Sequence, residues 1–333
     1  MEETPFINDQ EDNSATKKST PPVGYIPVKL SSLGRLTAPK IIHVRNYSGE
    51  EALKLSTMNA DNSLEVLVDA LQNLIWEDID ASMLNENEVE EIMLNIYVNW
   101  WNTSIDFPYQ WEEYELKELE AKRAEQIRTG SEVPKVTVNI ANIKTNTIMS
   151  EFKEPITIVH RDVKYWFRLS RVKDMMEAKE YVVDKYLAEE NRYSKISKDL
   201  EYNSSIDPNS PIPFKERPVD PKEKRAYQEY LNKRSIDFER ISQMGKVLKI
   251  GDKEVKTFED RITMYKEIPS DIWVKFNQII KKSIQFGVDP ELKVISPLTN
   301  KEVTRRFQFR ILDFIPTMEL PDDSEYTVLF GEQ

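Results

Sequence analysis

Apolar residues recur at helical spacing in the first third of the chain. Between residues 62 and 99, two segments place apolar side chains three and four positions apart, which predicts two helices that each bury one face. Ser48 and Glu51 have the spacing of a capping box, so we expect another short helix to begin there and to end near Asn59. Three short amphipathic helices in succession predict a small bundle. The two apolar stripes consist of Leu64, Leu67, Val68, Leu71, Leu74 and Ile75, and of Val89, Ile92, Met93, Ile96 and Tyr97.

A two-residue alternation of apolar and polar positions predicts two β-hairpins. The first covers residues 155–170 and turns at Arg161-Asp162. The second has a strand over 292–295, a turn over 296–300 and a return strand with one apolar face. That face consists of Val303, Phe307, Phe309 and Ile311. We expect Phe307 and Phe309 to pack on the preceding helix, which is predicted to stop at Gly287.

The remaining segments predict further helices and one linker. Helical patterns cover residues 174–187, 221–243 and 257–267, and Pro269 starts another helix. Residues 201–221 contain five prolines and no helical pattern, which predicts an extended, semi-rigid linker. Residues 111–130 are dominated by Glu, Lys and Ala, and they predict an exposed, charged helix inserted into the first module.

Together these elements predict an α+β fold in which small helical bundles are each followed by β-hairpins. The fold is divided into two modules, 23–200 and 222–316, which the proline-rich linker joins. Residues 1–22 are polar and lack periodicity, so we expect a disordered tail that stays solvated or becomes ordered on a partner. Residues 317–333 predict an acidic C-terminal tail.

The charge of the chain limits the classes of function that it can have. The 58 acidic residues outnumber the 46 basic ones, giving a formal net charge of -12. This balance argues against nucleic-acid binding as the main function, because such binding depends on neutralising phosphates with Lys and Arg. No run of 18 apolar residues is present and the N-terminus has no apolar h-region, so we expect neither a membrane span nor a secretory signal. An intracellular protein, or one assembled inside a cell, fits best.

Candidate catalytic chemistry is sparse. The absence of cysteine excludes disulfides, thiolate catalysis and Cys-ligated zinc, and the eight glycines do not have the spacing of a phosphate-binding loop. His43 and His160 lie in strand-like runs without a metal-binding spacing, and the acidic run from Asp78 lacks the glycine and glutamate of a calcium loop. We expect no catalytic residue, cofactor or metal. A carboxylate-dependent hydrolase is the alternative from a different class, since paired carboxylates occur throughout the chain.

Aromatic residues gather in one short stretch that suggests a surface for protein partners. Trp100, Trp101, Tyr109 and Trp111 are the candidate interface residues, because aromatic side chains carry much of the binding energy at such surfaces. Burial inside the monomer explains the same residues equally well. Residues 96–116 contain no Lys or Arg, so a base-stacking surface for nucleic acid is not expected.

Three stretches resemble one known family. The first is YIPVKLSSLGRL at 25–36 followed by the short helices, where Ser31 stands in place of the usual proline and Ser32-Leu33-Gly34 is retained. The second runs from the C-terminal helix through Gly287-Val288-Asp289 and the hairpin to Phe314-Ile315-Pro316, and the third is the middle hairpin PITIVHRDVKYWFRLSRVKD. Together they are similar to the T-even-type tailed-phage baseplate proteins, which are tied to assembly of the central tail hub.

The resemblance implies a structural role in a phage particle. Members of the family often carry Cys-Pro-x-Cys-Gly at the hairpin turn, a zinc knuckle, where this chain has Ser296-Pro297-Leu298-Thr299-Asn300. We expect a degenerate knuckle without zinc, with Ser296, Pro297 and Thr299 holding the turn through proline rigidity and side-chain hydrogen bonds. The implied partners are hub, tube or wedge proteins, in a homo- or hetero-oligomer located in the virion after assembly in the host cytoplasm. The alternative within this class is a soluble assembly chaperone that is absent from the mature virion.

Overall fold

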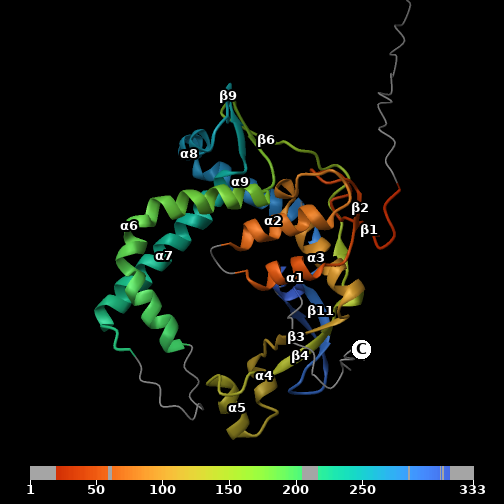
Figure 1. Cartoon of the computed structure of the whole chain (residues 1–333), viewed down its shortest axis with the longest axis vertical. Coiled ribbons are helices and arrows are strands. Elements are labelled where there is room, and N and C mark those ends of the chain that lie inside the picture. Colours follow the sequence, from red (N-terminus) through yellow and green to blue (C-terminus); the bar gives the residue numbers. More distant parts are fainter. Residues whose placement is uncertain are drawn as a thin grey trace, which may run out of the picture.

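The structure is a computed structural model, and it describes residues 20–58, 62–204, 217–283, 286–307, 309 and 311–315. Residues 1–19 and 317–333 of the expected tails, and residues 205–216 of the expected linker, lie outside these ranges. Within them the chain has the predicted α+β fold, with helices and several small antiparallel sheets (Figure 1).

Three helices form the bundle predicted near the N-terminus. The capping box is confirmed, since the Glu51 N–H donates to the Ser48 hydroxyl at 3.3 Å and the Ser48 N–H donates to the Glu51 carboxylate at 2.7 Å. The stripe predicted on the third helix is buried over Val89, Ile92, Met93 and Ile96. The elements of this region are β1 (Ile26–Lys29) paired with β2 (Ile41–Val44), then α1 (Gly49–Ser56), α2 (Ser63–Leu74), the 3-10 turn η1 (Ala81–Met83) and α3 (Glu86–Trp100).

Two short helices replace the single exposed helix expected over 111–130. They are α4 (Glu113–Leu116) and α5 (Ala121–Arg128), and they connect β3 (Ser104–Pro108) to its antiparallel partner β4 (Lys135–Asn139). Most of this segment is exposed, as expected, but the expectation of a single helix is wrong, and Leu116, Ala124 and Ile127 are buried in the main hydrophobic core. These few apolar side chains hold the charged segment against the body.

The predicted C-terminal hairpin is formed by β11 (Glu291–Ile295) and β12 (Glu302–Arg306). Its return strand is shorter than the alternation predicts, and the chain continues into the 3-10 turn η3 (Ile311–Phe314). Phe307 and Phe309 do not pack on the preceding helix, because both rings lie 5.5 Å from the ring of Phe107 on β3.

That preceding helix, α9 (Ser270–Ser283), packs on a different sheet. Phe276 of α9 stacks on Phe167 with 4.5 Å between ring centroids, so its apolar face is already covered. The sheet has the order β6-β7-β8-β9, and its first turn lies at Arg161 and Asp162 as predicted, with φ values of 49° and 65° that suit a type I′ hairpin. Its strands are β6 (Ile156–His160), β7 (Val163–Phe167), β8 (Val247–Ile250) and β9 (Lys253–Glu254), with α8 (Phe258–Glu267) beside β8; β5 (Thr145–Asn146) and β10 (Gly287–Val288) form a separate pair.

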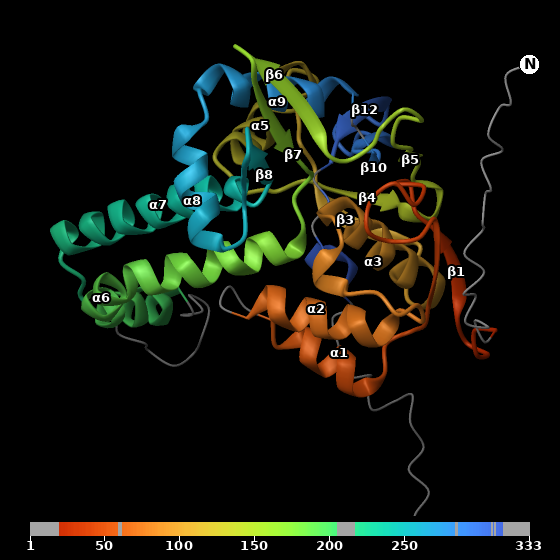
Figure 2. The ribbon, with the colours of Figure 1, turned by 90° about the horizontal axis from the view of Figure 1, so that it is seen from above.

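A long helical hairpin, which we call the arm, consists of α6 (Val172–Ser204) and α7 (Pro221–Met244). Figures 1 and 2 show it leaving the body beside α2 and reaching away from the bundle. The helix that the sequence predicted to end near Leu187 continues to Ser204. Residues 201–204, which were expected in the linker, are the last residues of α6. Tyrosine rings fill the contact between the two helices, with the Tyr193 ring 5.3 Å from that of Tyr230. These rings extend the buried stripe beyond the aliphatic pattern in the sequence.

The hydrophobic cores join the two segments expected as separate modules. The main core combines the N-terminal bundle with Val294, Leu298, Phe307 and Phe314. A second core packs β6 and β7 against β8 and α9, and a third lies inside the arm. Each core thus takes residues from both sides of the linker, so the two segments pack into one body.

Candidate functional site

Tyr109 of the aromatic stretch and Ser296 of the hairpin turn, both singled out in the sequence, meet at one buried carboxylate. Glu115 of α4 is fully buried and accepts hydrogen bonds from the Tyr109 hydroxyl at 2.5 Å and from the Ser296 hydroxyl at 2.7 Å. The Arg305 guanidinium donates to its other oxygen at 2.5 Å, and the Glu112 N–H donates to the same oxygen at 2.9 Å. The aromatic segment, the charged insertion and the hairpin are therefore tied together at this carboxylate.

Electrostatics keep Glu115 ionised. Burial alone raises the pKa of its carboxyl, but hydrogen bonds from Ser296, Tyr109, the backbone and Arg305 outweigh it and hold the pKa below its usual value. The pKa of Arg305 is raised, because hydrogen bonds to Tyr114 and Glu115 outweigh its own desolvation. Since the carboxylate is enclosed and all its strong acceptor positions are used, this arrangement serves to hold elements together and leaves no free base for catalysis.

The side chain of Ser296 holds the hairpin turn through hydrogen bonds, as expected, whereas the hydroxyl of Thr299 does not. The Ser296 hydroxyl oxygen accepts from the Leu298 N–H at 3.2 Å and the Thr299 N–H at 3.3 Å while donating to Glu115. Asn300 closes the turn with φ of 55° and donates its N–H to the Ser296 carbonyl at 2.9 Å. The Thr299 hydroxyl is buried without a hydrogen-bond partner among the described residues. Over the same residues, no cluster of three or more His, Asp or Glu side chains could hold a metal ion.

The four candidate interface residues fall into two groups. Tyr109 is only 4% exposed and belongs to the core, and Trp100 and Trp111 are half-buried against that core. Trp101 is 45% exposed, although its indole N–H donates to the Asn46 side-chain oxygen at 3.0 Å. Trp101 is therefore the residue of this set that remains accessible to a partner.

Sequence reasoning missed a second exposed tryptophan. Trp76 follows the last turn of α2, is 37% exposed and meets the Tyr25 ring edge-on at 5.6 Å. Arg45 lies beside one neighbour of each tryptophan. Its pKa is raised by Glu51 and, to a smaller extent, by the nearby Tyr25, and its guanidinium donates to the Asn46 carbonyl at 2.9 Å. Three acidic residues, Glu77, Asp78 and Asp80, follow Trp76 and are the signal in the sequence that this side chain leaves the core. The surface from Trp76 through Tyr25, Arg45 and Asn46 to Trp101 is called the aromatic surface below.

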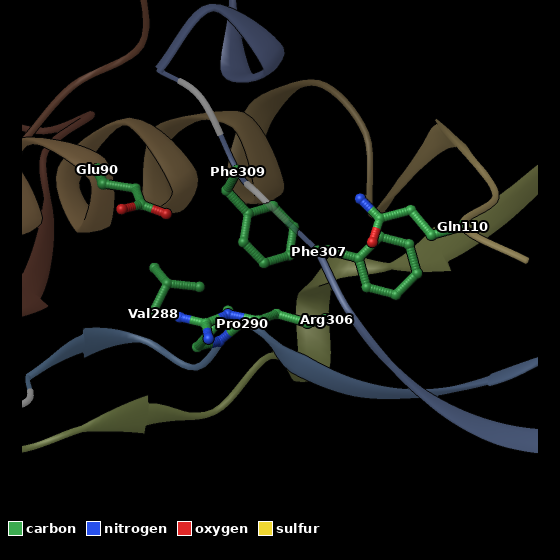
Figure 3. A pocket seen from close by; sticks show the side chains of 7 residues that line it. All are labelled: Glu90, Gln110, Val288, Pro290, Arg306, Phe307 and Phe309. Atoms are coloured by element: carbon green, nitrogen blue, oxygen red, sulfur yellow. The ribbon is translucent and has the colours of Figure 1, made fainter. Parts of the chain in front are cut away.

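A cavity of about 480 Å³ lies beside the hairpin, and Figure 3 shows the side chains that line it. Glu90 extends into it from α3 and Arg306 from β12. Burial, and then the neighbouring charges of Glu86, Glu91 and Asp313, raise the pKa of Glu90 to about 7. Glu90 is the one carboxylate of the described lining, whereas a carboxylate-dependent hydrolase uses two that face a common substrate.

A second buried carboxylate joins the two ends of the described chain. Glu91 of α3 accepts from the Ser31 N–H at 2.8 Å and from the Ser31 hydroxyl, whose oxygen accepts in turn from the Gly287 N–H at 3.0 Å. Burial raises the pKa of Glu91 to about 7, and the Ser31 hydrogen bonds offset part of that rise. Burial also raises the pKa of Glu88 one turn away. Neither side chain lines the cavity in Figure 3. Glu91 fixes the Ser31 loop against α3, and Glu88 accepts a hydrogen bond from the Asn85 N–H at the start of α3.

Comparison with known proteins leaves the function to be argued from this geometry. No family model, curated protein or solved structure with which the chain was compared matches it. In the described part of the chain, no helix combines the length and apolar character needed to cross a bilayer. Because fold alone does not determine function, the aromatic surface and the tied hairpin are the features to explain.

Proposed function

We propose that this chain is a non-enzymatic assembly protein, a structural component of the baseplate or tail hub of a tailed phage. The observation that carries the proposal is the aromatic surface, where Trp76 and Trp101 stay exposed at its two ends. Exposed tryptophans cost solvation free energy unless a partner covers them, and tryptophan is among the residues that dominate binding energy at interfaces.

The side chains of the aromatic surface are already ordered for docking. Tyr25 and Trp76 pack edge-on, and Trp101 is held by a hydrogen bond to Asn46, so both indole rings are positioned before binding. Side chains that are already ordered lose less conformational entropy on association. Arg45, paired with the buried Glu51, adds a polar group between the two rings.

The phage context rests on the residues that resemble the baseplate family. Two of the resembling stretches contain Ser31 and Gly287, which are hydrogen-bonded to each other across 256 positions of sequence. The corresponding hairpin turn is closed through Ser296 and Glu115. This contact makes the resembling segments parts of one structural unit, which supports reading them together.

A pull-down from phage-infected cells tests the proposal. The tagged chain is expected to retain hub, tube or wedge proteins, and the double variant Trp76→Ala/Trp101→Ala is expected to lose at least about 30-fold of that binding, as for a hot spot worth 2 kcal/mol. Val274→Ala is the matched control, because Val274 is also exposed but lies on α9. Retention of the same proteins by the double variant, with an unchanged melting temperature, would refute a role for this surface.

A further inference from the structure

The cavity beside the hairpin, shown in Figure 3, has an acidic side and a basic side. Glu90 of α3 extends into it, and Arg306 of β12 extends into it from the hairpin. After burial, three acidic neighbours raise the pKa of the Glu90 carboxyl, namely Glu86, Glu91 and Asp313. The side that α3 forms therefore favours a cation, and the side that β12 forms favours an anion.

The polar side chains of this cavity have no partner among the residues that the structure describes. The Glu90 carboxyl, the Arg306 guanidinium and the Gln110 side-chain amide form no hydrogen bond or ion pair there. Arg305, the neighbour of Arg306 on β12, differs in that it pairs with the buried Glu115. A half-buried carboxyl without a partner costs free energy. All three polar groups are thus available to a molecule that enters the cavity.

Apolar side chains supply the rest of the described lining. They are Phe307 and Phe309 of the hairpin segment, together with Val288 and Pro290. The volume of about 480 Å³ is within the range of small-molecule sites in proteins. An apolar lining with a few polar groups that fix orientation is what such sites provide.

A molecule that carries both charges satisfies both sides of the cavity at once. Glu90 is half-buried, so an ion pair formed there is screened less by water and salt than a pair on the open surface. The exposed guanidinium of Arg306 suits a carboxylate, because two of its N–H groups match the two carboxylate oxygens. A molecule with only one of the two charges leaves the other side of the cavity unpaired.

We propose that this cavity binds a short linear molecule with an ammonium group at one end, a carboxylate at the other and an apolar middle. The ammonium group pairs with Glu90, and the carboxylate pairs with Arg306. The amide of Gln110 forms a hydrogen bond with either polar end, and the apolar middle covers Phe309 and Val288. The bound molecule connects α3 to the hairpin. This inference concerns the isolated chain and does not depend on the proposed function.

A series of linear ω-amino acids of increasing length, from glycine to 8-aminooctanoate, tests the proposal. Ligand-observed NMR titrations are made at pH 8, where Glu90, with a pKa of about 7, is ionised. We expect the dissociation constant to reach a minimum at one intermediate length that spans both sides of the cavity. That compound should bind about tenfold more tightly than the alkylamine and the carboxylic acid of the same chain length, because each of these pairs with one side only.

Two charge-removing variants assign the two ends of the ligand. Glu90→Gln should abolish the advantage of the ω-amino acid over the carboxylic acid, and Arg306→Gln should abolish its advantage over the alkylamine. Because neither side chain has a partner in the described chain, neither variant should lower the melting temperature. Lys293→Gln is the matched control, since Lys293 is an exposed cation of the same hairpin outside the described lining, and it should leave every affinity unchanged.

Four results would overturn the proposal. One is the absence of binding by every member of the series at concentrations up to about 10 mM, which corresponds to a negligible affinity. The second is an affinity that rises steadily with chain length, because apolar partitioning alone would then explain it. The third is equal binding of the ω-amino acid and its single-charge analogues, and the fourth is binding that neither Glu90→Gln nor Arg306→Gln weakens.

Discussion

The Ser296 hydroxyl donates a 2.7 Å hydrogen bond to the Glu115 carboxylate across 181 positions of sequence. In the proposed resemblance to the baseplate proteins, Ser296 takes the place of a zinc-binding cysteine. In this chain the turn is thus closed onto a carboxylate from the α4–α5 insertion. The hairpin and the insertion depend on each other for this contact.

Glu115→Gln is expected to destabilise the protein by about 3 kcal/mol at pH 7, because it removes the charge of the fully buried partner of Arg305 and leaves that guanidinium only the exposed Glu112, at 3.2 Å. The pKa of Glu115 is lowered in the folded protein, so its contribution is present above the unfolded pKa and is lost as the pH falls through the folded pKa. The difference in the free energy of unfolding between the variant and the wild type should therefore become smaller at acidic pH. Urea unfolding at pH 7 and pH 3 measures both effects.

Glu118→Gln is the matched control for Glu115. Its partner Lys301 is exposed, so this surface pair should contribute at most about 1 kcal/mol. A similar loss for both variants would contradict the role of Glu115 as the buried junction.

Chelation of metal is expected to leave the hairpin intact, since its turn is held by Ser296 and its hydrogen bonds. Ser296→Ala should cost about 1–2 kcal/mol, because it removes bonds to Glu115 and to two backbone N–H groups. Melting curves with and without EDTA, together with elemental analysis, check both statements. Stoichiometric zinc, or a melting temperature that drops with EDTA, would refute them.

Stability should decline from mildly acidic to neutral pH because of the buried carboxylates of α3. The pKa of Glu91 is raised to about 7 from an unfolded value near 4.5, so the folded state is favoured when Glu91 is protonated. Its contribution is complete below the unfolded pKa and is lost as the pH rises toward 7, a change on the order of 3 kcal/mol for this fully buried group. Glu88 and Glu90, also with raised pKa values, act in the same direction.

Glu91→Gln isolates this effect, because glutamine does not titrate. Relative to wild type, the variant should gain stability between pH 4.5 and pH 8, measured by urea unfolding at several pH values. Glu113→Gln, on the exposed insertion, should leave the pH profile parallel to that of wild type. A parallel profile for Glu91→Gln as well would contradict the account.

Gly245 permits the close packing of the arm at its base. A Cβ at this position would lie 2.4 Å from the Asp174 side chain, which is buried and bound by Arg168 at 2.7 Å. Gly245→Ala should therefore destabilise the protein by about 1–3 kcal/mol through overpacking. Gly49→Ala is the control, because no atom lies within 4 Å of its added Cβ and alanine favours the helix that begins there. Thermal unfolding that ranks Gly49→Ala as the more destabilising change would refute this packing.

Local patterns in the sequence predicted the elements whose signals are local. The capping box at Ser48 and the turn at Arg161-Asp162 depend on neighbouring residues, and both are confirmed. The length of α6 was missed because its second half packs on α7 through half-buried tyrosines such as Tyr193, and tyrosine also suits exposed positions. The packing of Phe307 on Phe107 was missed because alternation shows which face is buried and leaves the partner element undetermined.

In the candidate site, too, contacts within one turn were predictable and contacts between distant elements were not. The hydrogen bonds of Ser296 within its own turn follow from turn chemistry. The hydrogen bond from Ser296 to Glu115 could not be predicted, because the composition does not show which of the 58 acidic residues lies beside the turn. The acidic residues after Trp76 indicate its exposure in the sequence, but its contact with the Tyr25 ring depends on the fold.

Quantitative mass spectrometry of purified virions, from a phage whose genome carries the sequence of this chain, tests the central claim most directly. A structural component of the baseplate or tail hub should be present at a fixed, stoichiometric copy number relative to known tail proteins. Absence of the chain from intact virions would contradict this claim, and co-purification with tail proteins only in infected cells would identify an assembly chaperone instead.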